Sequence, residues 1–194
     1  MNLQIIVGST RVGRRSLQFS KWIEKTAKEN KNLNVELVDL IDYDLPMFNE
    51  PVSPRYNPER KLEGDVKKFL EKLAKGDAYV FVTPEYNHSL SGVLKNALDY
   101  IAYELDKKPA AVATHGSVGG ARAAEHLKMI LSECRAVIVP INLHFNHFID
   151  SNIDEEGNLI KDLKELAYGP HTTVNTMLEE LTWYGQALKT AREH

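Results

Sequence analysis

A short apolar run near the start of the chain ends in hydroxyl and guanidinium groups. Gly8 closes the run, and Ser9, Arg11 and Ser16 then supply two hydroxyls and one guanidinium. The residues after Ser16 repeat apolar positions at helical spacing, so Ser16 stands where a helix begins. Free N–H groups at a helix N-terminus, with hydroxyls and a guanidinium beside them, favour a bound anion. This stretch therefore predicts an anion-binding loop between a strand and a helix.

A second group of polar residues follows a later apolar run. Pro84 and Asn87 favour a tight turn, because the proline ring fixes φ and asparagine tolerates unusual backbone angles. Between them, Tyr86 could lie against a planar ligand, and the backbone of residues 85–87 could meet the heteroatoms of its ring system. His88 comes next, but a loop histidine without a partner is more often exposed than catalytic. We expect this turn to bind a planar ring system.

Glycine dominates a third loop. Gly116, Gly119 and Gly120 surround Ser117 at the end of another apolar run. Glycine lets the backbone approach a ligand closely or turn sharply into a helix. A turn accounts for two of these glycines, and the third, together with the serine, indicates ligand contact. The role of His115, directly before this loop, stays open.

These loops belong to an alternating pattern of strands and helices. Such alternation predicts an α/β fold whose parallel sheet is covered on both faces. The polar loops follow the first, third and fourth strands, and they converge only in the strand order 2-1-3-4-5. We therefore expect a flavodoxin-like, open, doubly wound five-stranded parallel sheet. The strands are expected at residues 3–7, 35–40, 78–83, 110–114 and 136–141, with a closing helix at 173–192.

The bulk composition limits the class of protein. At 194 residues the chain has room for one substantial core, so we expect a single domain over residues 1–194. A net charge of -3 argues against a nucleic-acid partner and favours a small anionic ligand at the local basic cluster. No stretch approaches the roughly 18 apolar residues of a membrane span, and no secretion signal opens the chain. We expect a cytoplasmic protein with no membrane partner.

Metal and thiol chemistry have little basis in the sequence. Cys134 is the only cysteine, which excludes a disulfide framework and a cysteine metal site. It lies in the apolar pattern of a predicted helix, which favours a buried thiol acting as a small hydrophobic residue. We predict no metal ligands and no catalytic side chain.

The first loop suits a monophosphate better than a dinucleotide. A dinucleotide site requires G-x-G-x-x-G and an acidic residue for the ribose, whereas Gly8 and Gly13 stand alone and Asp39 is a weak match. One arginine with several hydroxyl and backbone donors can satisfy a nearly dianionic phosphate. In the alternative, Arg11 pairs with a carboxylate and the next two arginines are solvated.

Together, the three loops resemble those of the NADPH-dependent FMN reductase family. The resemblance rests on Gly-Ser-Thr-Arg at 8–11 with Ser16, on the block from Thr83 to Asp99, and on Gly-Gly-Ala-Arg at 119–122. The central block is its most specific part. The family is flavodoxin-like and includes quinone, azo-dye and chromate reductases.

The resemblance assigns the site residue by residue. The FMN phosphate would be held by Ser9, Arg11 and Ser16. This loop is one residue longer than is common in the family, so Arg15 could contact the phosphate in place of Ser16. Ser117 with its neighbours Gly116 and Gly119 would close the far side. The isoalloxazine ring would be lined by Pro84, Glu85, Tyr86 and Asn87.

The activity implied by the resemblance is ping-pong hydride transfer from NADPH or NADH, through FMN, to a small-molecule electron acceptor. The flavin carries the chemistry, so no protein acid or base need be found. The resemblance also implies a homodimer or homotetramer. The alternative is a flavodoxin-type electron carrier or flavin-binding regulator without its own NAD(P)H turnover, which the near-neutral charge and Arg11 disfavour.

Overall fold

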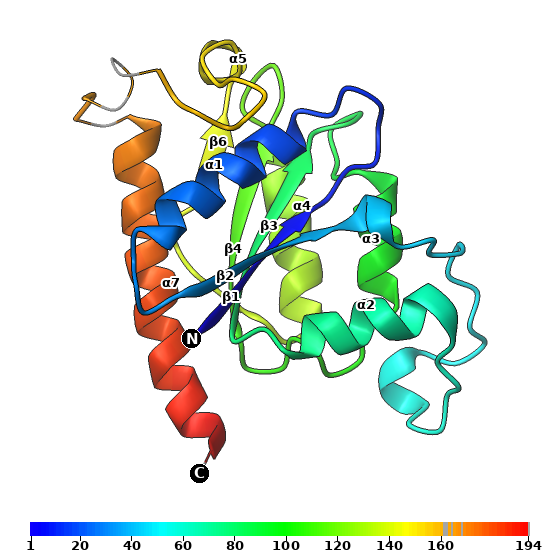
Figure 1. Ribbon diagram of the computed structural model, residues 1–194. Coiled ribbons are helices and arrows are strands. Elements are labelled where there is room, and N and C mark those ends of the chain that lie inside the picture. The colour runs from blue at the N-terminus through cyan, green and yellow to red at the C-terminus, as the bar shows by residue number, and fades with distance from the viewer. Residues whose placement is uncertain (161–162, 164, 168, 194) are drawn as a thin grey trace.

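The computed structural model describes residues 1–160, 163, 165–167 and 169–193, and a parallel sheet forms its centre (Figure 1). The strand order is β2-β1-β3-β4-β5, with β6 also paired with β4. This order confirms the predicted doubly wound arrangement and sets β1 beside β3. The strands are β1 (Asn2–Val7), β2 (Asn34–Asp39), β3 (Ala78–Pro84), β4 (Pro109–His115), β5 (Val137–Ile138) and β6 (Leu143–Phe145).

The predicted fifth strand differs from the observed one. The sequence predicts one strand over residues 136–141, whereas the structure has β5 and β6, separated by a segment that contains Pro140. Proline has no N–H to donate to a neighbouring strand, so it interrupts a hydrogen-bonded ladder. Both pieces pair with β4, β5 near its amino end and β6 at its carboxyl end. The interruption therefore brings β6 to the edge of the sheet where the polar loops lie.

Helices cover both faces of the sheet (Figure 1). One face carries α1 (Ser16–Lys28) and the closing helix α7 (Pro170–Glu193), which confirms the helix predicted there. The other carries α2 (Gly64–Ala74), α3 (Gly92–Asp99) and α4 (Ala121–Glu133). The short helices η1 (Leu40–Asp42), η2 (Pro54–Tyr56) and α5 (His147–Asp150) lie in the connections.

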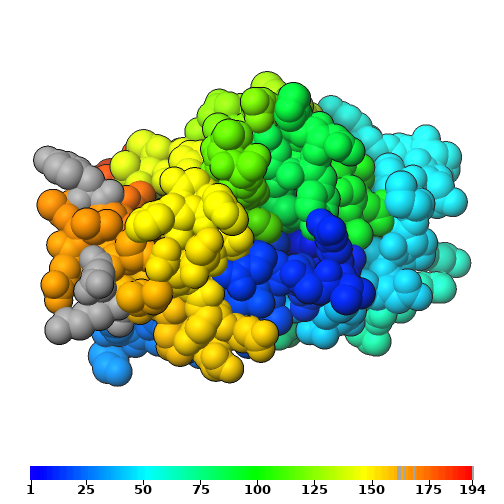
Figure 2. All heavy atoms as spheres, turned by 90° about the horizontal axis from the view of Figure 1, so that it is seen from above, coloured from blue at the N-terminus to red at the C-terminus, as the bar shows by residue number. Residues whose placement is uncertain are grey.

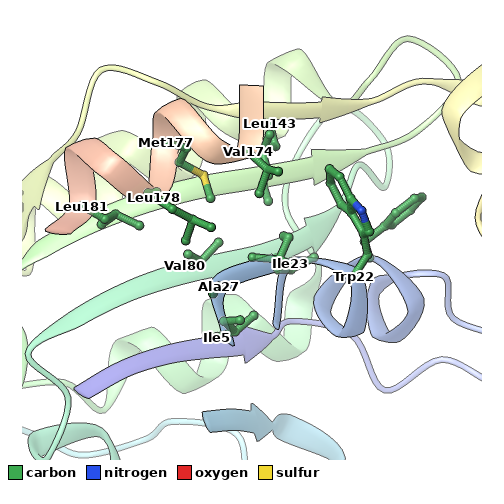
Figure 3. Close-up of a cluster of buried hydrophobic side chains, with 14 of the residues drawn as sticks. Ile5, Trp22, Ile23, Ala27, Val80, Leu143, Val174, Met177, Leu178 and Leu181 are labelled. Carbon is green, nitrogen blue, oxygen red and sulfur yellow. The ribbon is translucent and has the colours of Figure 1, made fainter. Parts of the chain in front are cut away.

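Two apolar clusters, one on each side of the sheet, hold these layers together. In the first, side chains of α1 and α7 meet those of the central strands, as Figure 3 shows for Ile23, Ile5 and Val80. Every residue of β3 is buried. A strand buried on both faces explains why its sequence is continuously apolar and does not alternate. From α7, the cluster receives Val174, Met177, Leu178 and Leu181.

The proline-rich connection between β2 and α2 runs over the surface. Asn96 on α3 fixes it, because its side-chain oxygen accepts a hydrogen bond from the Phe48 N–H at 2.8 Å. The amide nitrogen of Asn96 donates to the carbonyl oxygen of Pro46 at 2.7 Å. A buried amide that satisfies backbone groups stabilises an irregular segment without regular secondary structure.

Candidate functional site

The loop after β1 is held tightly against β3. The Gly8 N–H donates to the Val82 carbonyl at 2.8 Å, and a Cβ at Gly8 would stand 2.6 Å from that oxygen. Only glycine allows this approach. The loop then ends at α1, whose N-cap residue, Arg15, makes no side-chain capping bond. The first N–H groups of a helix have no partner within it, so this N-terminus can receive an anion.

The three arginines of this loop have different surroundings. Arg14 pairs with Asp39 at 2.5 Å and also donates to the Ser9 carbonyl, so it ties the loop to β2. Arg15 pairs with Asp150 at 2.6 Å and donates to the Ile153 carbonyl at 3.0 Å. This arrangement reverses the alternative considered from the sequence, in which these two arginines are solvated. A contact between Arg15 and a phosphate stays a prediction.

Arg11 is the arginine left available to a ligand. Its side chain is exposed, and no carboxylate in the described part of the chain pairs with it. The guanidinium carbon lies 5.8 Å from the centre of the Tyr86 ring. A guanidinium over an aromatic face is held in place without losing its charge. Arg11 therefore offers an unneutralised cation beside the open N-terminus of α1.

A tight turn follows β3. Asn87 and His88 have φ of 49° and 68°, in the left-handed region, and Tyr86 and Ser89 exchange backbone hydrogen bonds of 2.9 and 3.0 Å. Two such residues between paired strands are typical of a type I′ hairpin turn. The Tyr86 hydroxyl lies 3.3 Å from Ser9 Oγ, so the turn reaches back to the first loop.

Glu85 joins this turn to the helix that follows the third loop. Its carboxylate pairs with Arg122 at 2.7 Å and accepts a hydrogen bond from the Arg122 N–H at 3.0 Å. Burial raises the pKa of the Glu85 carboxyl, but the bonds from Arg122 and the Ala123 N–H outweigh it and hold the pKa below its ordinary value. The Glu85 side chain therefore caps α4. A contact between Glu85 and a flavin ring stays a prediction, and it would be made by the Glu85 backbone. Pro84, the last residue of β3, is buried in register with His115.

The glycine-rich loop after β4 turns sharply into α4. Gly120 precedes the helix with φ of 75°, and a Cβ there would stand 2.7 Å from the Cβ of Thr114. The Thr114 hydroxyl donates to the Gly119 carbonyl at 2.8 Å. Ser117 is exposed, and Gly116 accepts a backbone bond from Gly119. The turn into α4 therefore requires glycine at position 120. Gly116 and Ser117 lie in the part of the loop farther from the helix.

His115, whose role the sequence left open, connects two of these loops. Its Nε2 lies 2.8 Å from the hydroxyl oxygen of Ser16, a fully buried residue at the start of α1. The imidazole ring packs 5.0 Å from the ring of Phe19. Burial lowers the pKa of His115 to about 4, so the ring is neutral at neutral pH. A direct contact between the Ser16 hydroxyl and a phosphate stays a prediction.

The carboxyl ends of the strands bring the predicted residues to one face of the molecule. Viewed from above, the dark-blue segment after β1 lies against the green segments after β3 and β4 and the yellow segment around β6 and α5 (Figure 2). One end of this site offers Arg11 and the open N-terminus of α1. The other end offers the turn at Tyr86 and the glycine loop. This donor set fits a ligand with a phosphate at one end and a planar ring at the other.

A sequence model of the family described as NADPH-dependent FMN reductase matches residues 1–150, more than half of the chain. The chain belongs to this family. Family membership makes it an enzyme that uses FMN as cofactor and NAD(P)H as co-substrate. The matched range contains all three loops.

Individual relatives agree with the family. An NAD(P)H-dependent FMN reductase of Schizosaccharomyces pombe is 31% identical over 166 residues, which cover 84% of this chain and 83% of that protein. A quinone reductase of Escherichia coli is 27% identical over 195 residues, covering 96% of each chain. A flavoenzyme NAD(P)H:acceptor oxidoreductase of Paracoccus denitrificans has a similar fold, with a TM-score of 0.70, 21% identity and 97% of each chain covered.

The described residues of this FMN reductase include neither a membrane-spanning helix nor a metal-binding cluster. No helix among them is long and apolar enough to cross a membrane. Among the same residues, no group of three or more histidine, cysteine, aspartate or glutamate side chains is placed to hold a metal ion. Asp150 was missed from the sequence, because nothing near it in the chain signals its pairing with Arg15.

Proposed function

We propose that this chain is an FMN-dependent NAD(P)H oxidoreductase that works in two half-reactions, with quinones, azo compounds or flavins as electron acceptors. One observation carries the proposal: in the described part of the chain the N-terminus of α1 has no side-chain cap and Arg11 has no carboxylate partner, and both belong to the loop that contacts the Tyr86 turn. The relatives named quinone reductase and FMN-dependent NADPH-azoreductase support the choice of acceptors.

The chain's own residues bind and orient. Arg11, with Ser9 and Ser16 at the ends of the first loop, holds the phosphate end, and Arg15 is the remaining candidate there. Ser117, between Gly116 and Gly119, closes the far side of the ring. Pro84, Glu85 through its backbone, Tyr86 and Asn87 line the isoalloxazine.

FMN, when bound, would supply the hydride and electron transfer between the nicotinamide and the acceptor. The protein supplies orientation and electrostatics, so no acid–base residue is required. In the first half-reaction NAD(P)H leaves as NAD(P)⁺. In the second, a quinone takes up two electrons and two protons and leaves as the hydroquinone. Because both substrates use the same open face of the site, they bind in turn and not together.

The assembly and location of the protein also enter the proposal. Residues 1–194 would form a single flavin-binding domain that works as a homodimer or homotetramer in the cytoplasm. Large exposed apolar side chains support the oligomer: Met47 is 79% exposed and Phe148 is 60% exposed. Such side chains are often buried where subunits meet. Light scattering coupled to size-exclusion chromatography tests this part separately.

The absorbance spectrum of the purified protein tests the central proposal. We expect a yellow protein that is bleached by NADPH or NADH without oxygen and consumes the nucleotide steadily when a quinone is added. A colourless protein that does not bind added FMN would contradict the proposal. A protein that binds FMN but does not turn over NADPH or NADH would support the electron-carrier alternative instead.

A further inference from the structure

A side-chain hydrogen bond fastens the first turn of α1 to the end of β4. Ser16, the first residue of the helix, is fully buried, and its hydroxyl oxygen lies 2.8 Å from Nε2 of His115. His115 is the last residue of β4, and Gly116 begins the loop after it. The contact therefore joins the anion-binding end of the site to the loop at its other end.

The imidazole has little freedom to move. Its ring packs against Phe19, which is itself stacked on Phe145 of β6 with ring centres 4.1 Å apart. The charged groups that face it are Asp150 and Arg15, which act in opposite directions, while burial favours the neutral ring. A neutral, wedged imidazole can hold a hydroxyl in one direction over the whole neutral pH range.

This contact also bears on the capping of α1. Ser16 follows the N-cap residue Arg15, so its hydroxyl belongs to the first turn of the helix and not to its cap. Here the Ser16 hydroxyl is directed to His115, and the N-cap residue Arg15 makes no capping bond. The first-turn N–H groups receive no bond from the N-cap side chain, and the contact with His115 fixes the position of the turn that carries them. The adjacent Arg15 is anchored from a different side, by Asp150 and the Ile153 carbonyl.

We propose that His115 is a positioning residue for the phosphate end of the flavin site, because it holds the Ser16 hydroxyl and so fixes the open first turn of α1. The inference rests on the proposed function, since it assumes that FMN occupies this site. His115 acts through Ser16 and does not itself touch the reacting atoms. His115 therefore contributes to the binding of the phosphate and not to the binding of the flavin ring.

Three variants test this assignment. His115→Leu removes the hydrogen bond, Ser16→Ala removes its partner, and His115→Gln keeps a hydrogen-bonding group near the position of Nε2. The readouts are the dissociation constants of FMN and of riboflavin, which has the same ring and no phosphate, measured by flavin fluorescence quenching. Far-UV circular dichroism and thermal unfolding establish that each variant is folded.

We expect His115→Leu and Ser16→Ala each to weaken FMN binding about tenfold and to leave riboflavin binding unchanged. A tenfold change corresponds to the loss of one well-placed hydrogen bond. The double variant should be no worse than either single one, and His115→Gln should restore most of the loss. Equal weakening of both flavins, or unchanged FMN binding, overturns the inference. If His115→Leu does not fold, His115→Phe replaces it, because it keeps a ring against Phe19 and removes the hydrogen bond to Ser16.

The failure of the proposed function looks different. If the unaltered protein binds neither flavin, the family activity itself is wrong for this chain. If it binds FMN and consumes NADPH while the variants bind FMN equally well, only the role of His115 is wrong.

Discussion

Ser9 Oγ and the Tyr86 hydroxyl lie 3.3 Å apart, so the loop after β1 and the turn after β3 are in contact across the neighbouring strands. The two segments are 77 residues apart in the chain. Their contact fixes the two loops of the proposed flavin site against each other. It also places the Tyr86 ring beneath the guanidinium of Arg11.

Tyr86→Phe should weaken FMN binding about threefold to tenfold, because it removes one hydrogen bond and keeps the ring. Tyr86→Ala should weaken it further, since the aromatic surface is lost as well. Fluorescence titration with FMN measures both. Equal affinities for the unaltered protein and Tyr86→Phe would show that the Ser9 contact does not shape the site.

Arg11→Ala should weaken FMN binding by about 10- to 100-fold, because a charge-assisted bond to the phosphate is lost. Riboflavin binding should not change. The dependence of FMN affinity on salt should also fall. Lys31→Ala is the matched control, since it removes an exposed positive charge near the amino end of β2, away from the site. A similar loss in both variants would mean that overall charge, and not Arg11, attracts the ligand.

Arg15→Ala should loosen the segment around α5, because Arg15 is bonded to Asp150 and Ile153. Hydrogen exchange of residues 147–153 should become faster. We expect FMN affinity to fall less than in Arg11→Ala, since the Arg15 guanidinium is already engaged. A loss as large as that of Arg11→Ala, without faster exchange, would place Arg15 on the phosphate.

Gly120→Ala should destabilise the protein more than Gly13→Ala. Both glycines have similar φ, 75° and 70°, so the backbone strain of a side chain is matched. A Cβ at Gly120 would meet Thr114 at 2.7 Å, whereas nothing lies within 4 Å of one at Gly13. We expect an additional loss of about 1–3 kcal/mol at Gly120, read from urea unfolding. Equal losses would mean that the turn into α4 has room to relax.

His115 should make the folded protein less stable in acid. Its pKa is lowered from 6.5 to about 4 by burial, so between these two values the unfolded chain binds more protons than the folded one. Stability therefore decreases as pH falls through this window, by up to about 3 kcal/mol. Urea unfolding of His115→Gln, which cannot titrate, should show a smaller decrease between pH 6.5 and pH 4. Parallel curves for both proteins would contradict the lowered pKa.

The elements of the fold were predictable because each has a local cause. Apolar runs such as residues 78–83 and periodic stretches such as 173–192 lie where strands and helices form. The three loops were predictable from their glycine, proline and hydroxyl-bearing residues. The error in the fifth strand came from treating Pro140 as part of an apolar run, although proline cannot complete a ladder.

The contacts that tie the loops together could not be predicted in this way. Ser16 and His115 are 99 residues apart, and Arg15 and Asp150 are 135 residues apart. No spacing rule reaches over such separations, and only the packed sheet brings these side chains together. The sequence therefore indicates which residues lie in the loops at the carboxyl ends of the strands, but not which of them contact one another.

The interruption of the strand at Pro140 has a consequence for the solubility of the protein. At this side of the sheet, β5 has only two residues and β6 only three, with the exposed proline between them. A long unpaired edge strand can add strands from other molecules and start aggregation. Two short pieces give an incoming strand few backbone groups to pair with. The same break that places β6 beside the polar loops thus disfavours edge-to-edge pairing at this side of the sheet.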